Sequence, residues 1–448
     1  MLRAIYACLA AALLYAAACP SASAITLDAD FDHGSLASWS VSSPGSRLTS
    51  IDLVGRDNFY GGGAWRWMYF KASGLQSLAP VFNTSDNFAG GGERLDGHSM
   101  VWSYDNKNWR YFDNNERFSG RYRFSNDNPF AQDEVYVAYA FPYSYGKTVE
   151  HTQHVLQSPW ARPTASAGRG GVIGLSPGGV DDLGRSIAPR PMYAYRITNP
   201  ATDSPRLPKN KVVIMTGMHA GETLGTHTYQ GLVDWLISDN PVAARLRDTT
   251  EVFAYPTANP DGRFAGYNRS TVENPNQDPN GLWNPNLWVG HEDIAANGQA
   301  MLDDITGPTS TPGDRVDYFI DFHSTIPAFP GDDFGFIEED QGDDQSPFWQ
   351  ALLDIQPNIL RVDSTSTGWT SANFADRLLD AEVDVTFETM FGFERPLDYY
   401  HQLGENFGLA LAQGFGIEIP EPNTLLIVGI SLVGLGRRAT LRRAKSAR

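Results

Sequence analysis

The stretch Lys211-Val-Val-Ile-Met-Thr216 leads almost directly into Met218-His219-Ala220-Gly221-Glu222-Thr223, and these two segments decide the fold of the chain. The first is short, apolar and rich in β-branched residues, so it predicts a buried strand, while the pattern after the second predicts a helix over residues 222–238. Sheets of α/β proteins carry their chemistry at the carboxyl ends of the strands, so His219 and Glu222 are candidates to face one metal ion. With nine His and 52 Asp and Glu in 448 residues, a single His-x-x-Glu pair also arises by chance, and the rest of the chain must decide.

The first 24 residues have the organisation of a secretory signal peptide. Arg3 precedes an apolar run from Ala4 to Ala18, and the small-residue exit Ala22-Ser23-Ala24 follows. We expect cleavage after Ala24, with a structural first helix as the alternative. Both cysteines of the chain lie inside this segment, so the mature protein has no disulfide, cysteine ligand or cysteine nucleophile.

The other end of the chain, residues 417–448, predicts a sorting tail. Pro420-Glu421-Pro422 is followed by an apolar run from Leu425 to Leu435 and a cluster of six basic residues. This order resembles the PEP-CTERM tail of exported Gram-negative proteins, which implies cleavage by an exosortase-type enzyme after transient anchoring in the inner membrane. The resemblance implies a periplasmic, outer-surface or extracellular-matrix location. About 11 apolar residues are short for a full span, and an ordinary membrane anchor is the alternative.

The charge of the remaining body excludes nucleic acid as a partner. Residues 1–24 and 419–448 carry seven of the 34 Lys and Arg and one of the 52 Asp and Glu, which leaves 27 basic against 51 acidic residues and a net charge of −24. A body this acidic repels polyanions.

Residues 25–145 predict an all-β sandwich. Short aromatic and β-branched segments around residues 65–70, 100–104, 121–124 and 134–141 are separated by turn-forming residues. This part shows no catalytic group of residues, and we expect its isolated His33 and His98 to lie on the surface or in loops.

Residues 146–416 predict a catalytic domain in which strands and helices alternate. Strands are expected around residues 211–216, 251–256, 316–322 and 383–388, and helices over residues 222–238, 345–355, 371–380 and 402–413. This alternation predicts an α/β domain with a mixed, largely parallel sheet and helices on both faces. An earlier short helix carries His151 and His154 at the spacing of a metal pair, but they have no third partner nearby and we expect a solvated helix face.

Further polar motifs follow His219 and Glu222 at the ends of later strands. They are the turn Asn259-Pro260-Asp261-Gly262, then Arg269, Asp278-Pro279-Asn280, Asp321-Phe322-His323 and Glu388. In this order they resemble the M14 zinc carboxypeptidases. The N-terminal region and Phe141-Pro-Tyr-Ser-Tyr145 are similar to the cytosolic-carboxypeptidase-like, or deglutamylase-like, branch, and the resemblance covers residues 27–415.

The resemblance implies a role for each of these residues. His219, Glu222 and His323 are the implied ligands of one zinc ion, which two imidazoles and a carboxylate leave with an open position. Asp278 matches the carboxylate that orients the first histidine. Glu388 matches the general base that acts on the zinc-bound water, and Arg269 matches the arginine that polarises the scissile carbonyl.

Two departures from the family affect substrate binding. The arginine that pairs with the substrate's terminal carboxylate follows the Asp-x-Asn segment in the family, but here Gly281 follows Asn280. No Tyr occurs between His323 and Glu388, where the family has a substrate-contacting one, and Trp369 is the large aromatic near that place. The residues that could supply the positive charge missing at Gly281 are Arg263, Arg377 and Arg395.

The sequence therefore predicts an exported zinc metallocarboxypeptidase that hydrolyses a C-terminal peptide or γ-glutamyl-type amide bond. Asn280, Arg269 and Trp369 are its expected substrate contacts. One alternative is a zinc amidase that acts on cell-wall peptides or acylated amino acids, and another is an inactive surface binding protein. The acidic segment 332–344 is expected to be a solvated loop.

Overall fold

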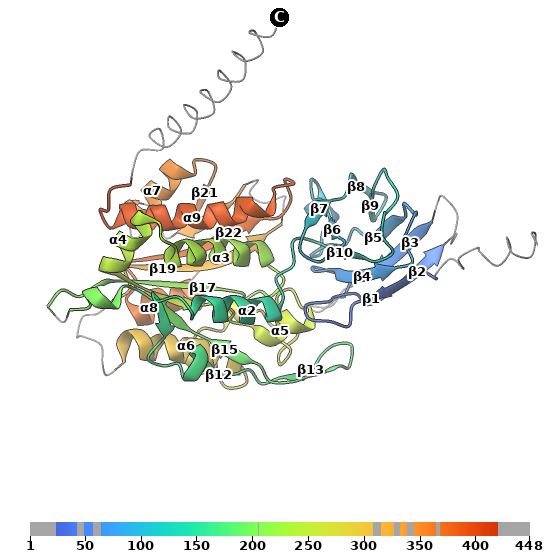
Figure 1. Ribbon diagram of the computed structural model, residues 1–448. Coiled ribbons are helices and arrows are strands. Elements are labelled where there is room, and N and C mark those ends of the chain that lie inside the picture. The colour runs from blue at the N-terminus through green and yellow to red at the C-terminus, as the bar shows by residue number, and fades with distance from the viewer. Residues whose placement is uncertain are drawn as a thin grey trace, which may run out of the picture.

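The computed structural model describes residues 24–42, 49–56, 64–204, 206–307, 315–326, 332–337, 345–363 and 368–419. A strand-rich N-terminal part lies beside a larger α/β part (Figure 1). The expected signal peptide, apart from Ala24, and the expected sorting tail beyond residue 419 lie outside the described residues. No helix among the described residues is both long enough and apolar enough to cross a membrane.

The N-terminal part is a sandwich of two five-stranded sheets. One sheet has the order β1 (Thr26–Asp28), β4 (Tyr69–Ser73), β10 (Val135–Ala138), β6 (Val101–Ser103) and β7 (Trp109–Tyr111). The other has the order β2 (Ser38–Ser42), β3 (Ser50–Val54), β5 (Val81–Ser85), β9 (Arg121–Ser125) and β8 (Asn114–Phe118). The strands expected near residues 100, 121 and 134 are confirmed. The one expected over residues 65–70 is wrong, because Trp65 forms only an isolated bridge to Phe88 and β4 begins at Tyr69.

His33 and His98 lie in loops, one of the two expected placements, but both are buried, so neither is a surface histidine. His33 is stacked on Trp67 with ring centroids 4.6 Å apart, and His98 is stacked on Tyr139 at 4.0 Å. A neutral imidazole is flat and packs as a small aromatic ring, so the polarity of an isolated His does not place it at the surface.

The α/β part is built on one eight-stranded mixed sheet. Its order is β11 (Ala161–Pro163), β16 (Tyr195–Ile197), β18 (Thr250–Tyr255), β17 (Asn210–Thr216), β19 (Tyr318–Thr325), β22 (Val383–Met390), β20 (Phe334–Ile337) and β21 (Leu360–Asp363). The four central strands from β18 to β22 are mutually parallel, and antiparallel pairs flank them. Parallel pairing brings the carboxyl ends of β17, β19 and β22 to one edge of the sheet.

Helices cover both faces of this sheet, as predicted (Figure 1). On β17, Val212 and Ile214 pack into one core cluster and Val213 and Met215 into the other, which is the alternation of a strand buried on both faces. The first face is covered by α2 (Tyr145–Val155), α3 (Thr223–Ile237), α4 (Pro241–Thr249), α7 (Pro347–Ile355) and α9 (Leu397–Gly414), and the second by α6 (Glu292–Thr306) and α8 (Ser371–Leu379). The hairpins β12 (Val172–Leu175) with β15 (Pro191–Tyr193) and β13 (Gly179–Val180) with β14 (Ser186–Ile187), and the short helix α5 (Pro260–Ala265), complete this part.

Helix α2 carries the His151 and His154 pair. His154 is exposed as expected, but His151 is buried and its Nε2 lies 2.9 Å from Oδ1 of Asp234 on α3. The expected solvated face is therefore wrong for His151, which joins two helices.

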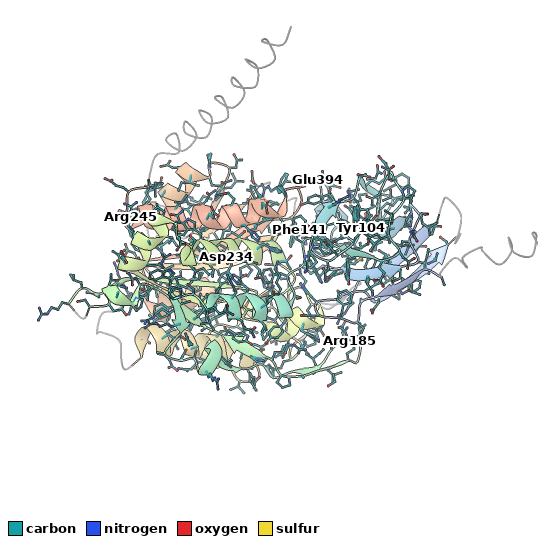
Figure 2. All side chains as sticks on the ribbon, viewed as in Figure 1. Tyr104, Phe141, Arg185, Asp234, Arg245 and Glu394 are labelled. Atoms are coloured by element: carbon teal, nitrogen blue, oxygen red, sulfur yellow. The ribbon has the colours of Figure 1, made fainter. Side chains whose placement is uncertain are left out.

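The two parts share a packed core. Leu224, Phe391 and Tyr400 of the α/β part belong to the core cluster of the sandwich. The Phe141 and Tyr400 ring centroids are 6.1 Å apart, and Ser99 donates a 2.9 Å hydrogen bond to Glu394, so both sides of this junction are in contact (Figure 2). Leu224 follows Glu222 by two residues, which brings the sandwich next to the turn that opens α3.

Candidate metal centre

The turn between β17 and α3 carries His219 and Glu222. Gly217 follows the end of β17 with a φ of +74°, a left-handed conformation that glycine adopts without steric cost. Gly225 lies in the first turn of α3, where a Cβ would stand 2.2 Å from the backbone oxygen of His323. The missing side chain at residue 225 thus lets α3 approach β19, the strand that carries His323.

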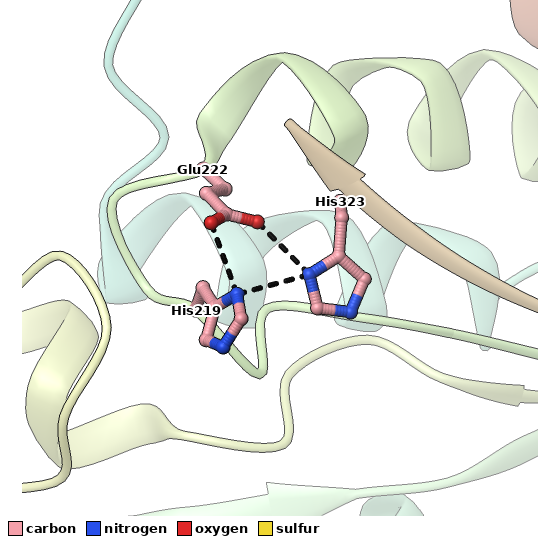
Figure 3. Close-up of side chains that lie close together, drawn as sticks. All are labelled: His219, Glu222 and His323. Carbon is pink, nitrogen blue, oxygen red and sulfur yellow. Dashed lines mark hydrogen bonds and ion pairs between the residues drawn. The ribbon is translucent and has the colours of Figure 1, made fainter. Parts of the chain in front are cut away.

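His219, Glu222 and His323 point toward one another (Figure 3). Oε1 of Glu222 lies 2.9 Å from Nδ1 of His219, Oε2 lies 2.9 Å from Nδ1 of His323, and the two Nδ1 atoms are 3.0 Å apart. All three side chains are buried. Within the described residues, they form the one group of three or more His, Cys, Asp or Glu whose ligand atoms lie within 4.8 Å of one another.

A carboxylate holds the outer nitrogen of each imidazole. Nε2 of His219 lies 2.8 Å from Oδ1 of Asp278, as expected for an orienting carboxylate. Nε2 of His323 lies 2.9 Å from Oδ2 of Asp321, and the same oxygen accepts a 2.5 Å hydrogen bond from Ser371 at the start of α8. These contacts place the ring protons on Nε2 and leave both Nδ1 atoms as electron-pair donors.

The donor set fits a metal ion. With one ring proton on each Nε2, the two Nδ1 lone pairs 3.0 Å apart repel each other, so a cation is needed between them: a proton on Nδ1 of His323 in the metal-free protein, or a metal ion in its place. Two imidazole nitrogens and one carboxylate are the ligands of catalytic zinc sites with an open position. Burial opposes a charge on His323, but Asp321 and Glu222 raise its pKa well above the ordinary value, so metal binding displaces a proton.

Arg269 links Glu222 of the triad to Asp278, the carboxylate that contacts His219. It donates hydrogen bonds of 2.9 Å to Oε1 of Glu222 and 2.8 Å to Oδ2 of Asp278. Burial works against the charge of Asp278, but His219 and Arg269 hold its pKa well below the usual range. Burial likewise opposes the charge of Glu222, whose pKa His219 and His323 lower. Both carboxylates are therefore ionised at neutral pH.

Glu388 stands at the same sheet edge, beside His323. The two residues are register partners in the parallel pair of β22 and β19, so their side chains leave the same face of the sheet. Burial and the charge of Glu222 raise the pKa of Glu388 to about 7, against the opposing effects of His323, His219 and Arg269. Oε2 of Glu388 is buried without a hydrogen-bond partner among the described residues. A bound cation would lower this pKa again.

Of the expected substrate-binding residues, Asn280 lies next to Asp278 and Trp369 lies just before α8. Oδ1 of Asn280 accepts a 3.2 Å hydrogen bond from the backbone of Ser371, and a Cβ at Gly281 would meet nothing within 4 Å. The ring of Trp369 lies 4.9 Å from the guanidinium carbon of Arg377, which stands near the other end of α8. The structure therefore brings Asn280 beside the orienting carboxylate and engages Trp369 with α8.

Two of the three arginines considered as replacement cations are already engaged. Arg263 is fully buried and donates to the backbone oxygen of Tyr143 and the hydroxyl of Thr226. Arg395 binds Asp333 with two 2.8 Å contacts. Asp333 itself is buried, which contradicts the solvated loop expected there, whereas residues 338–344 of that loop lie outside the described residues.

Sequence reasoning assigned no role to Asp321 or Ser371. Asp321 precedes His323 by two residues on one strand, and this spacing alone predicts that both side chains leave the same face. Ser371 is 50 residues away from Asp321, and only the packing of α8 against β19 brings them together.

Comparison with known proteins follows this geometry. Residues 179–324 match the M14 zinc carboxypeptidase family, and that range contains all three residues of the triad as well as Arg269 and Asp278. This part of the chain is therefore similar to an M14 zinc carboxypeptidase domain. Residues 418–443 match the PEP-CTERM protein-sorting motif.

Relatives of the M14 domain include cytosolic carboxypeptidases. The chain is 28% identical to human cytosolic carboxypeptidase 6 over 247 residues, which is 54% of this chain and 43% of that protein. It is 27% identical to cytosolic carboxypeptidase 2 of Danio rerio over 231 residues, which is 50% of this chain and 27% of that protein. The chain thus spans less than half the length of either relative.

Solved structures show the same fold over nearly the whole chain. A metallo-carboxypeptidase from Burkholderia cenocepacia superposes with a TM-score of 0.69 at 21% identity, covering 88% of this chain and 99% of that one. A metallo-carboxypeptidase from Pseudomonas aeruginosa gives a TM-score of 0.64 at 19% identity, covering 86% and 98%. The expected carboxypeptidase-like α/β fold with a strand-rich N-terminal part is therefore confirmed.

Proposed function

We propose that this protein is an exported zinc metallocarboxypeptidase that hydrolyses a C-terminal peptide bond or a γ-glutamyl-type amide. The observation that carries the proposal is the buried His219, Glu222 and His323 triad with Glu388 at the neighbouring strand position. A triad alone would fit a structural metal site. A hydrolase also needs a general base, and Glu388 stands beside the triad with its Oε2 buried and without a hydrogen-bond partner among the described residues.

The residues divide the reaction between them. Zinc held by the triad supplies a Lewis acid that polarises a carbonyl group and acidifies water. Glu388, next to His323 at the same sheet edge, accepts a proton from the attacking water and returns it to the leaving nitrogen. Arg269 supplies a fixed positive charge for the oxygen of the scissile carbonyl, and Asp278 holds both Arg269 and His219 in place.

The test is zinc content together with hydrolysis of a panel of C-terminal amino-acid and γ-glutamyl peptides. We expect about one zinc ion per chain. The substitution Glu388→Gln should lower kcat by about 10²- to 10⁴-fold, the usual contribution of a general base, with the zinc content kept. Glu382→Gln is the matched control, because Glu382 is an exposed residue just before β22 and contacts Arg315. Unchanged activity in the Glu388 variant would refute the assigned mechanism.

One observation favours a zinc amidase as a second candidate function. The space at Gly281 is open where the family carries an arginine for the terminal carboxylate, so substrates without that group can be accommodated. Gly281→Arg should raise activity on free-carboxylate peptides relative to their C-terminal amides if this segment faces the substrate end. No change in that ratio would place the carboxylate contact elsewhere. If the purified protein turns over neither peptides nor acylated amino acids, an inactive binding protein becomes the better description.

The PEP-CTERM motif supports export and processing by an exosortase-type enzyme, with transient anchoring at the inner membrane. In a Gram-negative host that contains an exosortase, the mature protein should lack both residues 1–24 and the tail by mass spectrometry. Retention of the intact tail in that host would contradict processing. We also propose residues 25–145 and 146–416 as the domain boundaries, which limited proteolysis near residue 145 would test.

A further inference from the structure

A cavity of about 700 Å³ lies where one sheet of the sandwich meets the start of helix α2. The α/β part lines it with Lys147 and Glu150 of α2, His227 of α3 and Leu397 of α9. No residue of the metal centre described above lines this cavity. Its volume lies within the range of about 300–1,000 Å³ that is usual for small-molecule sites, so it is large enough for a ligand of its own.

A row of side chains crosses the sandwich sheet and lines the cavity. Across the five strands, the register partners are in turn Asp28, Lys71, Tyr136, Ser103 and Trp109. Register partners project from the same face of a sheet, and all of them except Ser103 line the cavity. The residues next to Lys71 and Tyr136 along their strands are fully buried in the sandwich core, so the row lies on the outer face of the sheet.

Aromatic rings distinguish this outer face from an ordinary solvated one. The outer face of a sandwich sheet normally carries polar side chains. Here Phe31, Trp109 and Tyr136 line the cavity and are only partly buried. The buried Tyr69 lies among them, and its ring meets Phe31 edge-on at 4.9 Å and Trp109 edge-on at 6.0 Å. A cluster of partly exposed rings that line one cavity indicates a binding surface.

The charged groups of the cavity balance one another. Its lining contains three carboxylates and three ammonium groups, which are those of Asp28, Asp32, Glu150, Lys71, Lys107 and Lys147. Burial lowers the pKa of Lys147 to about 8, so this amine is still mostly protonated at neutral pH. The body as a whole has 51 acidic and 27 basic residues, and the balance in the cavity therefore differs from that of the rest of the protein. An anion and a cation would each meet repulsion there as well as attraction, which favours a neutral ligand.

Polar groups stand beside the aromatic rings. The hydroxyl of Tyr69 donates a 2.6 Å hydrogen bond to Oδ1 of Asn106, which leaves the Nδ2 group of Asn106 as a donor. Lys107 and Glu150 form no ion pair within the part of the chain that the structure describes. The cavity thus offers hydrogen-bond donors and acceptors next to apolar ring surfaces.

We propose that this cavity binds a neutral oligosaccharide, with Trp109 and Tyr136 against its sugar rings and Asn106 and Glu150 toward its hydroxyls. A pyranose ring with equatorial hydroxyls has two faces of C–H groups and a polar rim. The C–H groups carry a partial positive charge and are attracted to the negative face of an aromatic ring. Each hydroxyl both donates and accepts a hydrogen bond, which suits the mixed polar lining, whereas an apolar ligand would leave that lining without partners.

The test is calorimetric titration of the purified, zinc-loaded protein with cellotetraose and with chitotetraose carrying all its acetyl groups. Both probes are neutral and have equatorial hydroxyls. We expect one of them or both to bind, with an affinity that stays constant between about 50 mM and about 500 mM NaCl because no ion pair forms. Trp109→Ala should lower this affinity by about 2- to 10-fold, the range of one aromatic contact, and Trp109→Phe should retain most of it. The matched control is Trp39→Ala, at an exposed Trp on β2 of the other sheet, and it should bind as the wild type does.

A second measurement needs no variant, so it remains valid if Trp109→Ala does not fold. With saturating oligosaccharide, amide hydrogen exchange should slow in residues 104–109 and 144–150, which border the cavity, and should stay the same in residues 38–42 of β2.

Three results would overturn the proposal. They are no binding of either probe, binding that leaves both exchange and Trp109→Ala affinity unchanged, and tighter binding of tetragalacturonate that weakens with salt, which would indicate an anion site. Calorimetry and hydrogen exchange require no turnover, so the outcome is independent of whether the proposed peptidase function holds.

Discussion

Replacing Asp321 by Asn tests whether the second histidine depends on its carboxylate. Asp321 is fully buried, and its Oδ2 lies 2.9 Å from Nε2 of His323 while it accepts the 2.5 Å hydrogen bond of Ser371. Asparagine has the same shape, so the substitution removes the charge with little change in packing. What is lost is the charge assistance that makes the opposite nitrogen, Nδ1, a strong donor toward the metal.

The expected loss of zinc affinity in Asp321→Asn follows from two independent ranges. Hydrogen bonds to charged groups contribute about 1.5–3 kcal/mol, and each 1.4 kcal/mol corresponds to a tenfold change in an equilibrium constant. Loss of an orienting partner of a metal ligand typically costs about 10- to 100-fold in metal affinity, which is the same range. Zinc affinity of Asp321→Asn should therefore fall about 10- to 100-fold.

The assay is competition with a zinc chelator, combined with thermal unfolding of the zinc-free protein. Ser371→Ala is the graded control, because it removes a neutral donor to Asp321 and leaves the His323 contact intact. We expect a smaller loss of zinc affinity there, about 3- to 10-fold, because the carboxylate and its contact with His323 remain. A change of less than about threefold in Asp321→Asn would refute the reasoning, provided the unfolding temperature shows an intact fold.

Two further predictions concern stability. Burial lowers the pKa of His98 from its ordinary 6.5 to about 3. As the pH drops below about 6.5, the unfolded chain therefore binds a proton that the folded protein does not, and the free energy of unfolding falls. At pH 5 this decrease approaches about 2 kcal/mol. Denaturant titrations at pH 7 and pH 5 measure this decrease, and in His98→Gln the free energy of unfolding should depend less on pH. An unchanged pH dependence in that variant would exclude His98 as the cause. Gly225→Ala should lower the free energy of unfolding by about 1–3 kcal/mol or more, because its Cβ would stand 2.2 Å from the backbone oxygen of His323. In Gly281→Ala the new Cβ would meet nothing within 4 Å, so the decrease should be much smaller. Equal unfolding temperatures for these two variants would contradict the close approach of α3 to β19.

The sequence predicts the centre of the fold better than its periphery. β17, β19 and β22 are strands of seven or eight residues that are buried along most of their length, and the polar residues at their ends identify the edge where the site forms. Helix α3 is confirmed to within one residue at either end of the expected 222–238. Helices α4 and α6 were not expected. Helix α4 follows α3 after a short connection, and α6 follows a segment of short 3-10 turns without a clear preceding strand.

The sequence predicts those residues of the candidate site that end a strand or lie at the start of a helix. His219, Glu222 and His323 come together because parallel strands bring their carboxyl ends to one edge, which is a rule that sequence can use. Ser371 follows no such rule. It reaches Asp321 only through the packing of α8 against β19, which local sequence patterns do not encode.

The shared core suggests that the sandwich supports the metal-binding turn directly. Leu224 begins α3 two residues after Glu222, yet it is buried in the core of the sandwich, whereas Leu236 near the other end of α3 is buried in the core of the α/β part. Leu224→Ala and Leu236→Ala should each cost about 2–5 kcal/mol, because both leave a cavity in a packed core.

Leu224→Ala and Leu236→Ala should differ in their effect on zinc affinity. Only Leu224→Ala removes a contact that fixes the turn between His219 and the helix, so it alone should weaken zinc binding, measured by chelator competition at a temperature where both variants remain folded. The sandwich would then support the metal site through its contact with Leu224, although none of its described residues belongs to the triad. Equal zinc affinities in the two variants would show that β17 and α3 hold the turn without support from the sandwich.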